Sequence, residues 1–121
     1  MPVKQKCILI YDDDKEISIL CKMILQNQNY KVESRATCDN IINDIKTMNP
    51  SLILMDLWIP TVGGEKSLKL IRENPVSKNL PVLFFSANDD IEKISKRAGA
   101  SGYVRKPFDI TSFKEIINSW I

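Results

Sequence analysis

The stretch that decides the fold is residues 52–60, LILMDLWIP. Large apolar residues lead directly into Asp56, and Pro60 closes the stretch. A short apolar run without polar alternation is typical of a strand that is buried on both faces. A carboxylate is poorly tolerated inside a sheet, so we expect Asp56 at the end of this strand. There it either begins a turn or has been placed for chemistry.

The composition bounds the class of protein. The chain has 121 residues, of which 44% are hydrophobic and 26% charged, with a net charge of +2. This length predicts one domain over residues 1–121. The charge is too small to indicate nucleic-acid binding without a clustered basic face. The N-terminus lacks a signal peptide, and no apolar run reaches the roughly 18 residues that span a bilayer. We therefore expect a cytoplasmic protein with neither a nucleic-acid nor a membrane partner.

Histidine and cysteine usage narrows the chemistry further. The chain has no histidine, which excludes a Ser-His or Cys-His nucleophile pair and a histidine-based metal site. Its three cysteines, Cys7, Cys21 and Cys38, are widely spaced and form no CxxC motif, so we expect reduced, buried thiols. A functional site must therefore be built from carboxylates, hydroxyls, lysine and backbone groups.

The strand pattern predicts a parallel sheet. Continuous apolar runs predict interior strands at 6–11, 52–56 and 81–86, while the alternating 30–35 and the short 102–105 suit the edges. A helical pattern follows each strand, and this alternation indicates a parallel sheet covered by helices on both faces. With right-handed crossovers, the strand order is 2-1-3-4-5, the (βα)5 doubly wound, flavodoxin-like arrangement.

Helix ends are predicted from capping residues. Asp14 is expected to cap the first helix, Thr37 the second, Asn88 or Asp89 the fourth and Asp109 the last.

Glycines and apolar spacing complete the prediction of the helices. The pair Gly63-Gly64 marks a turn before a third helix over about 64–73, and Gly99 is expected to end the fourth. Leu20 in the first helix and Trp120 in the last fall on the apolar stripe and are predicted to face inward.

Polar residues follow four of the predicted strands. Asp12 and Asp13 come after the first strand, Asp56 ends the third, Ser86 the fourth, and Lys106 follows the fifth. Because the carboxyl ends of parallel strands share one edge, where ligands bind, we expect these side chains to meet. Carboxylates about 4 Å apart repel by roughly 4 kcal/mol at an effective dielectric constant near 20, so the group needs a proton or a cation.

The oxygen-only donor set indicates Mg²⁺. Asp13 and Asp56 are expected to hold the ion, and a backbone carbonyl near Trp58 could add a ligand. Lys106 supplies a positive charge that can pair with Asp56 when the site is empty.

Asp56 is the carboxylate best placed as a nucleophile. A carboxylate that takes a phosphoryl group becomes an acyl phosphate, and it needs no general base because it is already ionised. Lys106 would neutralise one phosphoryl oxygen, and the Ser86 hydroxyl and the Ala87 N–H would bind another.

Several motifs together closely resemble those of bacterial two-component response-regulator receiver domains (CheY-like). They are ILIYDDD at 8–14, LILMDLWIP with Gly64, the strand that ends in Ser86-Ala87, and GYVRKPF at 102–108. The resemblance covers essentially the whole chain. It implies a signalling domain that accepts a phosphoryl group on Asp56 and is not an enzyme, apart from auto-dephosphorylation.

The resemblance also implies roles for the remaining polar residues. Asp13 would hold Mg²⁺ directly and Asp12 largely through water, with the carbonyl of Trp58 as the backbone ligand. Ser86 would be the switch hydroxyl, Tyr103 the aromatic switch and Lys106 the phosphate-binding lysine. The Lys106–Pro107 bond is expected to be cis.

The implied partners follow from the same resemblance. The phosphoryl donor would be a sensor histidine kinase or a histidine phosphotransfer protein. Phosphorylation would switch the surface of the fourth helix, fifth strand and fifth helix toward a downstream protein target. The protein would be a monomer or a weak phosphorylation-dependent dimer.

Three residues depart from the family pattern, and they bear on how long the phosphoryl group would persist. Tyr11 stands where the family prefers a small aliphatic residue, and Gly63 where it often has Asp. Trp58 is bulky and, with Asn88, flanks the expected route of hydrolytic water, so these residues bear on the phosphoryl lifetime.

Three other functions are disfavoured. A phosphatase of the haloacid dehalogenase type needs a second acid where Trp58 stands. A flavin-binding electron carrier needs a Ser/Thr/Gly-rich loop where three acids follow the first strand. A pseudo-receiver would lack matched groups that this chain retains.

Overall fold

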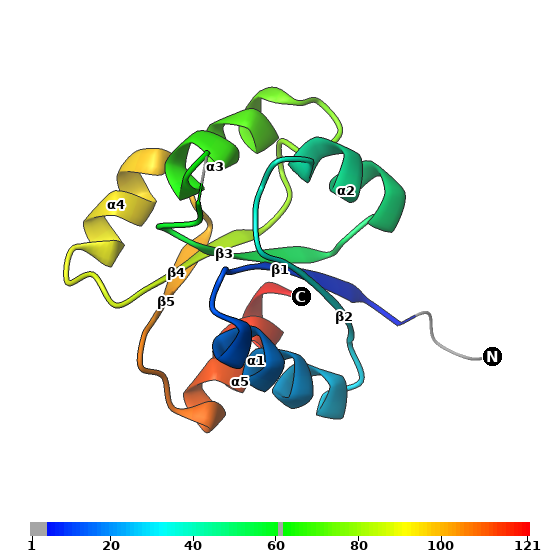
Figure 1. Cartoon of the computed structure of the whole chain (residues 1–121), viewed down its shortest axis with the longest axis vertical. Helices are drawn as coiled ribbons and strands as arrows, with labels where there is room; N and C mark the ends of the chain where they lie inside the picture. Colours follow the sequence, from blue (N-terminus) through cyan, green and yellow to red (C-terminus); the bar gives the residue numbers. More distant parts are fainter. Residues whose placement is uncertain (1–4, 61) are drawn as a thin grey trace.

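β3 (Leu52–Asp56) is the central strand of a five-stranded parallel sheet in the computed structural model, which describes residues 5–60 and 62–121. β1 (Cys7–Tyr11) and β4 (Val82–Ser86) flank it, and β2 (Lys31–Arg35) and β5 (Gly102–Arg105) form the edges. The order β2-β1-β3-β4-β5 confirms the predicted topology (Figure 1). Every residue of the three interior strands is buried, as their continuous apolar sequences predict.

The helices cover both faces of the sheet. α1 (Lys15–Asn27) and α5 (Ile110–Trp120) lie on one face. On the other lie α2 (Ile41–Met48), α3 (Gly64–Glu73) and α4 (Ile91–Ala98), as Figure 1 shows. Alternate strand residues therefore enter two separate cores.

The alternation can be followed in β1 and β3. Leu9 and Ile53 pack toward α2, α3 and α4, whereas Ile10 and Leu54 belong to the core beneath α1 and α5. The side chains that directly follow these strands continue to alternate between the two faces. This alternation sets the direction of the polar side chains at the carboxyl edge.

Two predicted helix caps are confirmed. Asp14 Oδ1 accepts hydrogen bonds from the backbone N–H groups of Glu16 (3.0 Å) and Ile17 (3.3 Å) at the start of α1. Asp109 Oδ2 accepts one from the backbone N–H of Ser112 (2.9 Å) at the start of α5. At each site a carboxylate satisfies N–H groups that have no partner within the helix.

The other two predicted caps are wrong. α2 begins after Asn40, because the chain between Thr37 and the helix makes a further turn in which Ile41 N–H bonds to Cys38 C=O (3.2 Å). α4 begins after Asp90, and neither of these helices has a side-chain cap. Asn88 instead accepts a hydrogen bond from the N–H of Asp90 (2.8 Å), a turn that lies before the helix.

Two residues predicted to face inward lie partly in solvent. Leu20 is 41% exposed, because the buried stripe of α1 is centred on its neighbours Cys21 and Leu25. Trp120 is 42% exposed and rests on the edge strand, where a Cβ at Gly102 would lie 3.3 Å from its ring. As predicted, Gly99 ends α4 with a positive φ of 85°.

Candidate functional site

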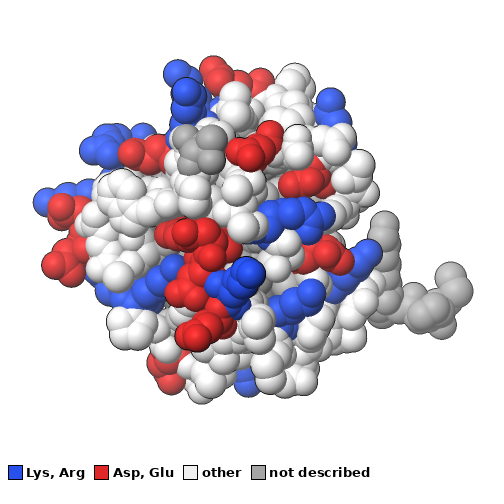
Figure 2. All heavy atoms as spheres, in the orientation of Figure 1, with Lys and Arg blue, Asp and Glu red and all other residues white. Residues whose placement is uncertain are grey.

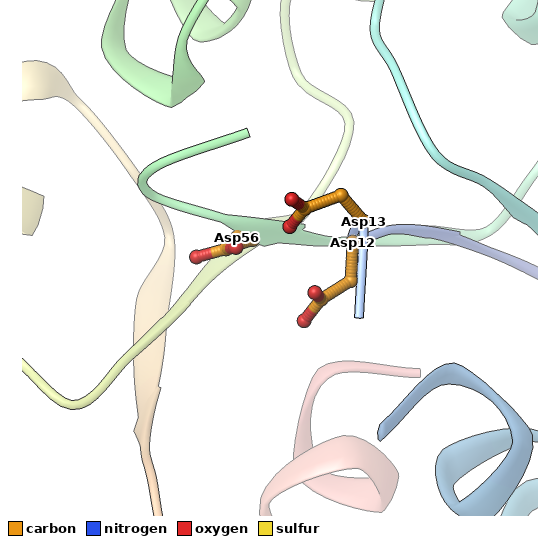
Figure 3. A group of neighbouring side chains, drawn as sticks. All are labelled: Asp12, Asp13 and Asp56. Atoms are coloured by element: carbon orange, nitrogen blue, oxygen red, sulfur yellow. The ribbon is translucent and has the colours of Figure 1, made fainter. Parts of the chain in front are cut away.

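Three carboxylates converge at the carboxyl edge of the sheet. Asp12 and Asp13 follow β1, and Asp56 ends β3. One oxygen from each lies within 4.8 Å of the others, and Figure 3 shows the three side chains gathered beside the strand ends. Asp12 and Asp56 are only 3% and 8% exposed, whereas Asp13 faces solvent. Two of the three charges have therefore lost most of their water, and the third lies at the mouth of the cluster.

Lys106 compensates part of this charge, but through a different partner from the one predicted. Its Nζ lies 2.8 Å from Asp12 Oδ2, so the expected pair with Asp56 is wrong. The Asp12 side chain is 1% exposed, and a carboxylate this deeply buried gains most from a hydrogen-bonded cation. The same ammonium lies 4.5 Å from the ring centroid of Phe85, a cation–π contact that sequence reasoning missed.

Backbone groups hold Asp12 and Asp56 in different ways. Asp12 Oδ1 accepts a hydrogen bond from the N–H of Asp14 (2.9 Å), so both of its oxygens are engaged. Asp56 accepts one hydrogen bond among the described residues, from the N–H of Trp58 to Oδ1 (3.2 Å). Asp56 therefore retains more capacity than Asp12 to bind a new group.

The environment keeps the Asp56 carboxyl easier to protonate than a free one. Burial is the main cause that raises its pKa, and the charges of Asp12 and Asp13 raise it further. Lys106 and the N–H of Trp58 act in the opposite direction and only partly offset this rise. The ionised form of Asp56 is thus destabilised by its surroundings, and a bound cation would stabilise it.

The backbone after Asp56 is held close to α3. A Cβ at Gly64 would lie 2.9 Å from Leu57 C=O and 3.0 Å from Asp56 C=O, too close for any side chain. The N–H of Gly64 donates to Leu57 C=O (3.0 Å) at this approach. The glycine of the sequence motif therefore sets the path of the loop that carries Trp58, whose own side chain is 68% exposed.

The predicted switch residues lie on neighbouring strands, Ser86 at the end of β4 and Tyr103 within β5. Ser86 is 2% exposed, and its Oγ accepts a hydrogen bond from the N–H of Asn88 (3.0 Å). Ala87 follows it and is exposed. Tyr103 is half-buried against the core beneath α2, α3 and α4, and the Arg105 guanidinium lies 5.9 Å from the centroid of its ring. The Lys106–Pro107 bond is cis, as predicted.

A second polar network lies beside the site and was not predicted. The buried Tyr11 hydroxyl donates to Asp44 Oδ2 (2.8 Å), and Arg35 Nε lies 3.9 Å from the same oxygen. Burial first, and then the hydrogen bond to Asp44, raises the pKa of Tyr11 far above its usual range. A tyrosine in a buried strand, where its hydroxyl needs a partner, was the available signal.

The acidic cluster can also be recognised in the distribution of charge on the surface. Figure 2 shows acidic side chains gathered near the middle of the face on which β1 gives way to α1, with lysine and arginine on either side. The three carboxylates of the cluster would therefore repel an anion unless a cation neutralised part of their charge.

A model of the response regulator receiver domain family matches residues 8–118. The chain belongs to this family. It is a receiver domain with an acidic cluster and a phosphoacceptor of two-component signalling. Along the described residues, no helix is long and apolar enough to cross a membrane.

Individual relatives match almost the whole chain, in sequence or in structure. Sporulation initiation phosphotransferase F of Bacillus subtilis is 28% identical over 116 residues, which are 94% of this chain and 92% of the relative. A putative response regulator from Chloroflexus aurantiacus has a TM-score of 0.91 at 24% identity, with 97% of this chain and 98% of that one covered.

A third relative carries a metal. The receiver domain of sensor histidine kinase PA1611 from Pseudomonas aeruginosa was solved with a magnesium ion in its active site cleft. It has a TM-score of 0.86 at 22% identity, and the match covers 97% of this chain and 98% of that one. Many other curated relatives are longer, and the chain spans less than half of their length.

Proposed function

We propose that Asp56 is the phosphoacceptor of this receiver and takes its phosphoryl group from a phosphohistidine on a partner protein. The observation that carries the proposal is the position of Asp56. It ends the central strand, is 8% exposed, and has an oxygen within 4.8 Å of two further carboxylates. A sensor histidine kinase or a histidine phosphotransfer protein is the partner whose chemistry fits.

The transfer is a displacement at phosphorus. A carboxylate oxygen of Asp56 attacks the phosphorus atom, the P–N bond to the partner's imidazole breaks, and its electron pair stays on the imidazole nitrogen. The product is an acyl phosphate on Asp56. Because Asp56 Oδ1 already accepts the N–H of Trp58, we assign the attack to Oδ2.

The acidic cluster fits Mg²⁺, since it offers only carboxylate oxygens and carries more negative than positive charge. Asp13, Asp56 and the carbonyl of Trp58 would hold the ion directly. Asp12 would act largely through water, because Lys106 and the N–H of Asp14 already occupy its oxygens. When bound, Mg²⁺ supplies positive charge that offsets the charge of the phosphoryl oxygens.

Lys106, Ser86 and Ala87 then bind the remaining phosphoryl oxygens. The Lys106 ammonium is restrained by Asp12 and by the ring of Phe85, so little side-chain entropy is lost when it turns to the new anion. The Ser86 hydroxyl and the Ala87 N–H lie at the end of β4, the strand next to β3. Movement of Ser86 toward the phosphoryl group frees space for Tyr103, which turns inward.

The phosphorylated state therefore differs on the surface of α4, β5 and α5, where a downstream protein target binds. The protein works in the cytoplasm as a monomer or a weak phosphorylation-dependent dimer. Auto-dephosphorylation by water returns Asp56 to the free carboxylate, and the bulky Trp58 beside it affects the access of that water.

The test is intact-mass analysis after incubation with Mg²⁺ and acetyl phosphate. Wild-type protein is expected to gain about 80 Da, the mass of HPO₃, and Asp56→Asn is expected to gain nothing. Asp39→Asn, which removes an exposed carboxylate outside the cluster, is the matched control and should react like wild type. An adduct that persists in Asp56→Asn would refute the assignment.

A further inference from the structure

Arg105 links the two parts of the proposed switch. It ends β5 and is the register partner of Ser86 in β4. Its guanidinium lies 5.9 Å from the ring centroid of Tyr103. Its Nη1 also donates to the backbone carbonyls of Asn88 (3.5 Å) and Asp89 (3.4 Å). One side chain thus contacts both the aromatic switch residue and the loop that follows the switch hydroxyl.

Apart from Arg105, the hydrogen bonds that restrain this loop are local. The N–H of Asn88 donates to Ser86 Oγ (3.0 Å), that of Asp90 to Asn88 Oδ1 (2.8 Å), and that of Ile91 to the carbonyl of Asn88 (3.1 Å). α4 begins without a side-chain cap. The carbonyls of Asn88 and Asp89 face Arg105, so this side chain is a tether between the loop and β5.

The far end of α4 is held more firmly. Arg72 in α3 donates from Nε to the carbonyl of Gly99 (3.1 Å), the residue that ends α4, and from Nη1 to that of Leu80 (2.6 Å), which precedes β4. These hydrogen bonds are shorter than those of Arg105, and Arg72 is partly buried whereas Arg105 is exposed. The unequal restraint makes the N-terminal end of α4 the end that can move.

We propose that Arg105 is a latch that holds the β4–α4 loop, residues 87–90, and Tyr103 in the unphosphorylated arrangement. The inference rests on the proposed function, because it assumes that Ser86 and Ala87 move toward a phosphoryl group on Asp56. That movement displaces the Asn88 and Asp89 carbonyls from Arg105, and the inward turn of Tyr103 takes its ring away from the guanidinium. Arg105 acts through the loop and is therefore a positioning residue.

The latch is weak enough to open. Its hydrogen bonds are long, and a cation–π contact at an exposed site contributes little. A ligand that binds only the open arrangement has its apparent affinity reduced by the fraction of molecules that are closed. Arg105→Ala should therefore bind a phosphoryl mimic about three to ten times more tightly than wild type.

Charge alone predicts the opposite sign. Arg105 is a cation near an anion-binding site, so its removal would weaken the binding of an anion if the side chain acted only through its field. The direction of the change therefore separates a latch from an electrostatic contribution.

The experiment is a titration with beryllofluoride at fixed Mg²⁺, followed by the fluorescence of Trp58 in a Trp120→Phe background. Wild type, Arg105→Ala, Arg105→Lys and Lys93→Ala are compared, the last of which removes an exposed cation from α4. We expect tighter binding for Arg105→Ala, an intermediate value for Arg105→Lys, and a wild-type value for Lys93→Ala. Amide exchange in the free proteins should be faster in residues 87–90 of Arg105→Ala.

Each result decides between distinct conclusions. If wild type binds beryllofluoride and Arg105→Ala binds equally or more weakly, there is no latch and the proposed function stands. If Lys93→Ala tightens binding as much as Arg105→Ala, the effect does not come from the contacts of Arg105 and the latch is refuted. If wild type does not bind at all, the proposed function fails and the latch fails with it. Should Arg105→Ala not fold, Arg105→Lys carries the same comparison.

Discussion

Replacement of Lys106 by methionine tests how the acidic cluster is balanced. At 2.8 Å from Asp12 and an effective dielectric constant near 20, the Lys106 charge contributes about 6 kcal/mol of Coulomb attraction. Carboxylate pairs within 4.8 Å repel by about 3.5 kcal/mol or more on the same scale. Much of both terms is offset by desolvation and by solvent screening, because the Lys106 side chain is 19% exposed and Asp13 faces solvent.

Loss of one partner of a buried ion pair typically costs 3–5 kcal/mol, and the partial exposure of Lys106 reduces this. We therefore expect Lys106→Met to lower the free energy of unfolding by about 2–3 kcal/mol at pH 7 without divalent cations. Mg²⁺ should restore part of the loss. A cation at 100 times its Kd adds about 2.7 kcal/mol to a folded state, and the variant, whose cluster has one positive charge fewer, should gain more from the ion than wild type does. By linkage, the variant should also bind Mg²⁺ more tightly than wild type.

The assay is urea unfolding of both proteins, in EDTA and across a Mg²⁺ titration. Lys66→Met, which removes an exposed lysine of α3, controls for the change in net charge and should unfold like wild type. The reasoning is refuted if Lys106→Met is as stable as wild type in EDTA. It is also refuted if the loss has the same size with and without Mg²⁺, because the ion would then not replace the lysine charge.

Two further predictions concern stability. Because burial raises the pKa of Asp56, its protonated form contributes stability that is fully present below the unfolded pKa and is lost as pH rises through the raised folded pKa. Asp56→Asn should therefore be more stable than wild type at pH 7 without Mg²⁺ and should lack this loss in urea unfolding between pH 3 and 7; equal pH profiles would contradict this. Arg72→Ala removes hydrogen bonds to the carbonyls of Gly99, Lys78 and Leu80 and to the Ser101 hydroxyl, and should cost about 2–4 kcal/mol in the same assay. A loss below about 0.5 kcal/mol, the usual range of a surface substitution, would show that Arg72 does not hold the end of α4.

The strands were predicted from sequence to within one residue. The expected 52–56 and 102–105 match β3 and β5, and the expected 6–11 becomes β1 (Cys7–Tyr11). A strand buried on both faces must be apolar throughout, so its first and last residues can be predicted from the residue types. The polar residues that follow such strands then had to lie on one edge, which is how the acidic cluster was predicted.

Helix ends and partly exposed residues were predicted less well. Thr37 and Asn88 can cap a helix chemically, but the chain makes another turn before α2 and α4 begin. Trp120 lies on the apolar stripe of α5, yet the edge of the sheet leaves it 42% exposed. Periodicity gives the direction of a side chain, whereas the neighbouring elements decide how much of it they cover.

The sequence alone determined that carboxylates, a hydroxyl and a lysine meet at one edge of the sheet, and that Asp56 ends its central strand. Only the tertiary structure decided how their charges are paired. Lys106 binds Asp12 rather than Asp56, and Arg105 reaches the carbonyls of Asn88 and Asp89. The reason is physical: strand order follows from residue type, but electrostatic pairing depends on distances of a few ångströms and on burial, and only the packed chain sets both.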